Sequence, residues 1–156
     1  MLDPMGILRT AIAIEHPARR GIIVELSDVI VDTGSEYTWV PQPVLESIGL
    51  APERVVDFVT SDGRQIERGV GFANIYVAGT STPDLIVFAA RGDLVLLGAR
   101  TLDGLNLRVD LVRRTLVHGG PVPAAAAPLP GDAREPLHPH PTRLPYLRHY
   151  VSVRSA

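Results

Sequence analysis

The sequence predicts an all-β fold of short strands accompanied by one or two short helices. Three observations support this class. Runs rich in Val, Ile and Thr recur over residues 1–118, and Gly, Pro and Asp separate them. Asp62-Gly63 stands between two extended runs, which is the strongest short-range signal for a β-hairpin. The segments with helical spacing are short.

The two N-terminal runs are predicted strands. Arg9–Glu15 alternates partly between apolar and polar residues and ends at His16-Pro17. Gly21–Val31 is longer, is dominated by Val and Ile, and ends abruptly at Asp32-Thr33-Gly34-Ser35. An Asp-containing turn therefore follows a buried strand.

The segments that follow predict a helix, a hairpin and further strands. Pro41–Leu50 has Pro where a helix would start and Gly49 where it would stop. Arg54–Thr60 and Gln65–Phe72 flank the turn at residues 61–64, so they are predicted to pair. Beyond them the sequence predicts strands at Ala73–Ala78 and Asp84–Ala89, an apolar run at Leu94–Leu97 that closes on Gly98, a short helix at Thr101–Leu107 and a strand at Arg108–Val117.

Composition excludes several classes of function. The 156 residues are 46% hydrophobic, which suits one core and leaves little room for a second domain. A formal net charge of -2 offers no basic surface to a phosphate backbone, so nucleic acid is not a predicted partner. Cysteine is absent, which excludes disulfides, thiolate metal sites and cysteine nucleophiles.

The N-terminus bears on location in the cell. Residues 1–15 lack the basic start and apolar run of a signal peptide. No later run approaches the roughly 20 apolar residues that span a bilayer. The sequence therefore predicts a soluble cytoplasmic protein with no membrane partner, and it leaves open whether Met1 or Met5 is the true start.

Prolines crowd the chain from Gly119 onward, at a density that helix interiors and central strands do not tolerate. We therefore expect a domain over residues 1–118 and a Pro- and Ala-rich C-terminal tail over residues 119–156. The end of the tail, Leu144–Val153, is apolar and aromatic again, which suggests that it docks on something. His138 and His140 lie in this tail without a preorganised third ligand, so no metal site is predicted.

Asp32-Thr33-Gly34 is the motif with chemical meaning. Three specified residues arise by chance in roughly one chain in fifty of this length, so the context decides. Here the triplet closes an apolar β run, and Leu96-Leu97-Gly98 leads into a short helix later in the chain. An ordinary turn residue at Asp32 is the alternative, but it leaves the Leu-Leu-Gly segment and the hairpin unexplained.

With these features the sequence resembles the retroviral-type (retropepsin-like) aspartic proteases, in the bacterial and archaeal single-lobe form. The resemblance rests on the Asp-Thr-Gly-Ser turn, the helix carrying Val44–Leu50, the Asp62-Gly63 hairpin and Leu96–Leu102, and it covers about residues 6 to 118. It implies a small closed barrel, a homodimer with the substrate cleft across its two-fold axis, and an aspartic endopeptidase that cuts peptide or protein substrates.

The chemistry requires two carboxylates. Held about 3 Å apart, they cannot both ionise and so share a proton, as is well known for aspartic proteases. The second carboxylate would be Asp32 of another copy, across a two-fold axis. The ionised Asp32 takes a proton from the attacking water while the protonated one polarises the peptide carbonyl. No metal and no cofactor is needed.

Four residues are the catalytic candidates, and each has an expected role. Beside Asp32, the Thr33 hydroxyl is implied by the resemblance to bond the backbone of the opposite subunit. The Gly34 amide is expected to donate to the Asp32 carboxylate. Ser35 stands where the family often has Ala. Its hydroxyl is expected to donate to the same carboxylate, which favours the ionised form and predicts an acidic pH optimum.

Other residues carry two interpretations each. Ser61, Asp62, Gly63 and Arg64 form a candidate flap over the substrate, and a plain solvent hairpin is the alternative. Trp39 is expected to pack in the core rather than against substrate, Arg100 to sit at the dimer interface or in solvent, and Asp110 to be an exposed strand or turn residue.

Two further functions stay open at this level. The chain could be a retropepsin-fold dimerisation or peptide-binding module with little turnover, although an intact Asp32-Thr33-Gly34 argues against it. The tail from Gly119 could also occupy the cleft of its own or a neighbouring dimer until it is cut.

Overall fold

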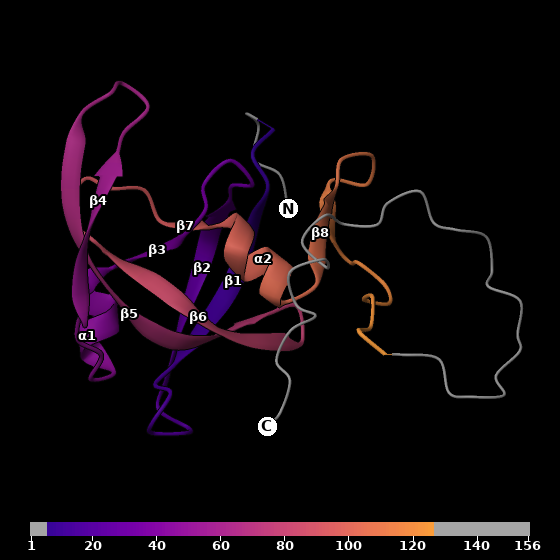
Figure 1. Cartoon of the computed structure of the whole chain (residues 1–156), viewed down its shortest axis with the longest axis horizontal. Helices are drawn as coiled ribbons and strands as arrows, with labels where there is room; N and C mark the ends of the chain where they lie inside the picture. Colours follow the sequence, from indigo (N-terminus) through magenta and orange to yellow (C-terminus); the bar gives the residue numbers. More distant parts are fainter. Residues whose placement is uncertain (1–5, 127–156) are drawn as a thin grey trace, which may run out of the picture. The chain divides into compact units, whose positions relative to one another are not determined.

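A computed structural model of the protein describes residues 6–126 (Figure 1). The chain divides into two units, residues 1–122 and 123–156. The first unit is mostly β with two short helices, which confirms that part of the predicted fold class. No helix within residues 6–126 is long and apolar enough to cross a membrane. The predictions for His138, His140 and Leu144–Val153 lie outside the described residues.

The elements, in chain order, are β1 (Arg9–Glu15), β2 (Ile23–Val31), β3 (Thr38–Pro41), α1 (Gln42–Ser47), β4 (Arg54–Val59), β5 (Gln65–Val77), β6 (Thr80–Ala89), β7 (Leu96–Leu97), α2 (Ala99–Gly104), β8 (Leu107–Asp110) and β9 (Thr115–His118). In the described part of the chain, seven strands form one sheet in the order β1-β2-β7-β3-β6-β5-β4, and β1 also pairs with β5. β8 and β9 form a separate two-stranded sheet.

β7 is the short strand that organises the centre of the sheet. It runs parallel to β2, with Leu96 opposite Ile30 and Leu97 opposite Val31, and antiparallel to β3, with Leu96 opposite Trp39. The strand that leads into Asp32 and the strand that follows the turn therefore flank the same two leucines. This arrangement holds both ends of the Asp-Thr-Gly turn against one strand.

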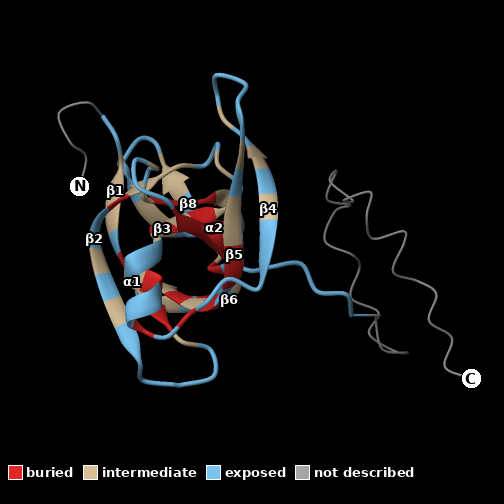
Figure 2. Ribbon diagram, turned by 90° about the vertical axis from the view of Figure 1, so that its left-hand side faces the viewer, coloured by how far each residue is buried: buried red, intermediate tan, exposed pale blue. Residues whose placement is uncertain are grey.

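The core consists of the aliphatic side chains that alternate inward along these strands. Figure 2 shows the buried segments, in red, gathered around β3, β5, β6 and α2. The fully buried members include Ile14, Val29, Val40, Leu45, Ile75, Ile86 and Leu97. Each such burial stabilises the fold by about 1.5–3 kcal/mol relative to exposure. Val29 of β2 and Val40 of β3 belong to this core, so the strands on either side of the Asp-Thr-Gly turn are anchored in it.

Several predicted boundaries are wrong: the strand predicted at Asp84–Ala89 begins at Thr80, and the helix predicted at Thr101–Leu107 spans Ala99–Gly104. The predicted strands Gln65–Phe72 and Ala73–Ala78 are one strand, β5, which pairs with β6 without a break from Val70 to Val77. No Gly-Pro or Asx turn signal separates the two segments, so nothing interrupts the ladder.

The predicted strand Arg108–Val117 is instead the β8–β9 hairpin. The Asp110 carboxylate accepts hydrogen bonds from the amides of Val112 (2.9 Å) and Arg113 (2.8 Å), and Arg114 has a φ of 55°. This is an Asx turn, in which a side chain replaces the strand ladder as the acceptor for the backbone. The Asp in the middle of the apolar run was the local signal for it.

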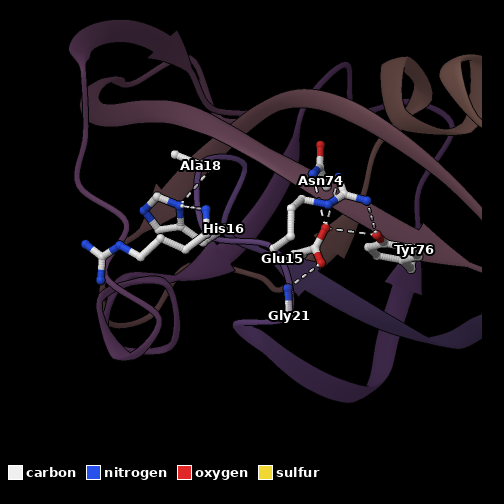
Figure 3. Close-up of polar contacts among 8 residues, drawn as sticks. Glu15, His16, Ala18, Gly21, Asn74 and Tyr76 are labelled. Atoms are coloured by element: carbon white, nitrogen blue, oxygen red, sulfur yellow. Dashed lines mark hydrogen bonds and ion pairs between the residues drawn. The ribbon is translucent and has the colours of Figure 1, made fainter.

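A buried carboxylate ties the end of β1 to β5 (Figure 3). The Glu15 side chain accepts hydrogen bonds from the Gly21 amide (2.9 Å), the Tyr76 hydroxyl (2.9 Å) and the Asn74 amide (3.2 Å), and it lies 3.2 Å from the Arg20 guanidinium. These partners, the Gly21 amide first, hold the pKa of Glu15 below its ordinary value.

This cluster predicts a pH-dependent stability. Because the pKa of Glu15 is lower in the folded than in the unfolded state, its contribution is present above the unfolded value and is lost as pH falls through the folded value. Urea unfolding of wild type and Glu15→Gln should therefore show a smaller loss of stability on acidification in the variant. The control is Glu53→Gln, at an exposed position. Equal acid sensitivity of wild type and Glu15→Gln would contradict this role.

Candidate active site

The Asp-Thr-Gly turn is entered from a strand whose end is fixed by β7. The Ile30 amide donates to the Val95 carbonyl (3.3 Å), and the Asp32 amide donates to the Leu97 carbonyl (3.0 Å). The backbone of Asp32 is therefore held to the same ladder that buries Leu97. This leaves the Asp32 side chain half-buried at the surface.

Within the turn, Gly34 serves the carboxylate directly. The Gly34 amide donates to Asp32 Oδ1 at 2.9 Å, and the Ser35 amide donates to the Asp32 carbonyl at 3.3 Å. A Cβ on residue 34 would lie 3.2 Å from Asp32 Oδ1, so only glycine keeps that oxygen clear of a side chain. Thr33 and Gly34 are themselves exposed.

The expected role of Ser35 is not what the structure shows. Its hydroxyl donates to the Tyr37 carbonyl at 3.2 Å. A serine has a single hydroxyl proton, so this bond uses the donor that was expected to serve Asp32. The prediction of Ser35 as a donor to the carboxylate is therefore wrong, and the acidic pH optimum inferred from it loses its basis.

The exit of the turn is held by the start of α2. The amides of Ala99 and Arg100 donate to the carbonyls of Ser35 (2.7 Å) and Glu36 (3.0 Å). Gly98 makes this close approach possible, since a Cβ there would lie 2.3 Å from the Tyr37 carbonyl oxygen. Turn and helix therefore form one unit.

Gly98→Ala is expected to destabilise the protein strongly. The new Cβ would collide with backbone that cannot rotate away, so the cost should be at least about 3 kcal/mol, the upper end for overpacking. Gly63→Ala is the control: its Cβ meets nothing within 4 Å, so only left-handed strain of about 1–2 kcal/mol remains. Urea unfolding measures both variants. Equal losses would show that the packing at residue 98 is not as close as described.

Behind the turn, four residues form a hydrogen-bonded series that sequence reasoning missed. Thr101 Oγ1 donates to Asp84 Oδ2 (3.0 Å) and lies 2.6 Å from Thr38 Oγ1, which accepts the Gly98 amide (3.0 Å). Because the Thr101 proton goes to Asp84, the Thr38 hydroxyl must donate to Thr101. Both threonines are fully buried, so the series links β3, β6 and α2 inside the protein.

Arg100 is engaged within the chain. Its guanidinium lies 3.5 Å from Asp84 Oδ1 and 5.2 Å from the centroid of the Tyr37 ring, and its side chain is partly exposed. Arg100 thus covers Asp84, at the outer end of the hydrogen-bonded series. It also packs on Tyr37, whose carbonyl accepts the Ser35 hydroxyl. Neither of the two interpretations of Arg100 included these contacts.

The predicted hairpin turn is present and is held by its own side chains. The Thr60 amide donates to the Arg64 carbonyl (2.9 Å), and Gly63 has a φ of 84°. The Asp62 carboxylate accepts from the Thr60 hydroxyl and pairs with Arg64 Nε (2.8 Å). These two partners, Thr60 first, lower the pKa of Asp62. All of this turn is exposed.

A cavity of about 330 Å³ lies between this hairpin and the Asp-Thr-Gly turn. Gly34 and Ser35 line one side of it, and Phe58 and Ile66 from β4 and β5 line the other. Trp39 lies half-buried in the same wall, with its ring centroid 4.9 Å from that of Phe58. Trp39 therefore faces the cavity as well as its packing partner, and Phe58 is a lining residue that the sequence did not single out.

A second, open groove of about 710 Å³ has Asp32 and Thr33 in its wall. Residues 6–8, α2 and β8 supply most of the remaining lining, which is largely apolar. Exposed apolar side chains lie along it: Leu94 is 63% exposed and Leu111, at the β8–β9 turn, is 82% exposed. The candidate catalytic carboxylate thus lies in the open groove, and the end of the same turn, Gly34 and Ser35, lines the cavity under the hairpin.

Comparison with known proteins finds similarity at the level of structure but not of sequence. No protein-family model matches the chain, and no curated protein matches its sequence. Among solved structures, the chain is similar to the solution structure of simian foamy virus (mac) protease. The two are 20% identical with a TM-score of 0.42, and the match covers 61% of this chain and 91% of that chain.

The predicted site residues lie on two surfaces of the protein. In residues 6–126 no group of three or more His, Asp or Glu side chains is placed to hold a metal ion. Of the four predicted catalytic residues, Gly34 and Ser35 line the cavity under the hairpin, whereas Asp32 and Thr33 line the open groove. Asp62 and Arg64 bond each other and do not line that cavity, since its hairpin side is lined by residues of β4 and β5 and by Thr60.

Proposed function

We propose that this protein is an aspartic endopeptidase of the retropepsin type that works as a homodimer. One observation carries the proposal. The Gly34 amide donates to the Asp32 carboxylate, and the Asp32 backbone amide donates to the Leu97 carbonyl. The carboxylate lies in the wall of an open apolar groove. That position leaves room for the same carboxylate of a second chain. The β1–β5 pairing supports the closed barrel that such a fold has.

The two copies of Asp32 would have different protonation states and different roles in catalysis. One is ionised and removes a proton from the water that attacks the peptide carbonyl, while the other is protonated and donates to the carbonyl oxygen. The amide of Gly34 steadies each carboxylate in the orientation that the pair requires. Thr33, exposed next to Asp32, is the residue best placed to bond the opposite chain.

The cavity under the hairpin indicates which substrates fit. An extended peptide would pair its backbone with strands of the cleft and place one side chain between Trp39 and Ile66. The edge-to-face contact of Tyr37 with Phe58, with ring centroids 5.7 Å apart, makes this an aromatic lining. A large apolar side chain close to the cut bond is therefore the expected preference.

The open groove indicates where the second chain binds. Leu111 and Val112 at the β8–β9 turn are 82% and 93% exposed, a degree of exposure that neighbouring apolar residues seldom share on a monomer's surface. An isolated two-stranded sheet is also marginally stable in water, so a partner that covers it contributes to its stability. A second copy that brings its Asp32 to this groove would cover the exposed Leu111 and Val112 as well as the β8–β9 sheet.

Digestion of a peptide library tests the function. Wild-type protein is incubated at several pH values, and mass spectrometry records the products. We expect internal cleavage next to large apolar residues, together with dimers in sedimentation velocity. Dimers that bind peptides without any cleavage would instead support the dimerisation or peptide-binding module. Cleavage of the tail from residue 119 onward would support its proposed inhibitory role.

A further inference from the structure

The arm of the β4–β5 hairpin makes an ion pair with another part of the chain, in addition to the ring contacts of Phe58. Residues 65–69 of β5 pair with β4 but not with β6, whose pairing begins at Val70. This part is therefore a two-stranded ribbon that projects from the sheet (Figure 1). From it, the Arg68 guanidinium reaches Asp93 in the loop between β6 and β7.

The geometry of this contact is that of a strong ion pair. Arg68 Nε lies 2.6 Å from Asp93 Oδ2, and Arg68 Nη2 lies 2.9 Å from Asp93 Oδ1. The side chains are only 21% and 15% exposed. Exposed single-contact pairs contribute little, but a two-pronged pair shielded from water is stronger and also fixes direction. The ion pair therefore fixes the position of the hairpin arm relative to the β6–β7 loop.

Asp93 is itself held in place. Its Oδ2 accepts the Ala90 amide at 2.7 Å, and its own amide donates to the Ala90 carbonyl at 3.0 Å. Two residues further on, the Val95 carbonyl accepts the Ile30 amide, in the ladder that fixes Asp32. The pair therefore connects the hairpin arm to the loop that enters the strand supporting the candidate catalytic turn.

The same contact lies close in the sequence to a residue that lines the cavity. Arg68 and Ile66 are two residues apart on β5, so they point to the same face of the ribbon. Ile66 lines the cavity opposite Trp39. An arm fixed at Arg68 therefore keeps Ile66 over the cavity, and an arm released there would expose more of the half-buried Trp39 ring to water.

We propose that the Arg68–Asp93 pair is a latch that positions the β4–β5 hairpin over the substrate cavity. The latch rests on the proposed function for its effect on catalysis, but its effect on the hairpin does not depend on cleavage. Arg68 and Asp93 are positioning residues, because they would act on substrate through the wall of the cavity.

The protein has one Trp, and its position makes the latch measurable without any substrate. In Arg68→Ala and Asp93→Asn, acrylamide should quench Trp39 fluorescence about twofold or more faster than in wild type, and amides of residues 65–69 should exchange faster. Arg64→Ala is the matched control. It removes an exposed pair at the tip of the same hairpin, with Arg64 74% exposed, and should leave quenching unchanged.

Two further variants distinguish loss of the ion pair from a general loss of stability. The charge-swapped pair Arg68→Asp/Asp93→Arg should recover only part of the protection of Trp39, because Arg at position 93 cannot accept the Ala90 amide. Arg68→Lys should also recover part of it. With a peptide substrate, the single variants should raise KM by about tenfold with a smaller change in kcat. Trp39 quenching equal to wild type in Arg68→Ala and Asp93→Asn would overturn the latch. A wild type that cuts nothing would count against the protease, and the quenching would still decide the latch.

Discussion

Asp32→Asn is expected to abolish peptide cleavage while leaving the fold unchanged. The Asn side chain has the same shape, and its Oδ1 can still accept the Gly34 amide. It cannot ionise, so neither member of the pair can take a proton from water. Loss of a general base typically costs 10²–10⁴-fold, and here both carboxylates change at once. Product formation followed by mass spectrometry, together with circular dichroism, measures the result.

The control for this variant is Asp57→Asn, at an exposed carboxylate on β4. It changes the same chemical group and should retain full activity. Sedimentation velocity should show that Asp32→Asn still forms dimers, which separates loss of chemistry from loss of assembly. Cleavage by Asp32→Asn at the wild-type rate would rule out Asp32 as the catalytic carboxylate.

Leu111→Glu/Val112→Glu is expected to dissociate the dimer and to remove activity with it. Both side chains are almost fully exposed in the single chain, so charges there should cost the monomer little stability. In a dimer whose interface covers this turn, the same charges would be buried without partners, which is strongly unfavourable. Sedimentation velocity over a range of concentrations should show monomers only.

Ile22→Glu is the matched control for this surface. Ile22 is 45% exposed and lies in the turn between β1 and β2, away from the residues that line the open groove. The control should remain dimeric and active. Unchanged dimerisation of Leu111→Glu/Val112→Glu would mean that the second chain binds elsewhere, and the interface proposed above would be wrong.

Local chemistry explains what the sequence could predict. The bounds of β1 agree with the structure, and the hairpin turn at residues 61–64 lies where the Asp-Gly pair placed it. Helix α1 has Pro41 at its N-cap, and Gly49 follows it with a φ of 83°. Each of these features depends on residues close together in the chain, so the pattern of side chains was sufficient.

Contacts between distant residues explain what the sequence could not predict. Thr38 and Thr101 are 63 positions apart, and Arg68 and Asp93 are 25 apart, and neither pair has a local signature. Ser35 shows the same limit at short range. The sequence suggested the Asp32 carboxylate as the acceptor for its hydroxyl, but the path of the backbone between residues 35 and 37 brings the Tyr37 carbonyl to it instead.

Mixing of wild-type and Asp32→Asn chains tests the central claim most directly. If each active site uses Asp32 from two chains, random exchange at equal concentrations leaves only about one quarter of the dimers with both carboxylates. Activity per wild-type chain should then fall to about half, and it should keep falling as more Asp32→Asn chains are added. Activity per wild-type chain that stays constant at every mixing ratio, with exchange shown by sedimentation of labelled chains, would contradict a site shared between two copies of Asp32.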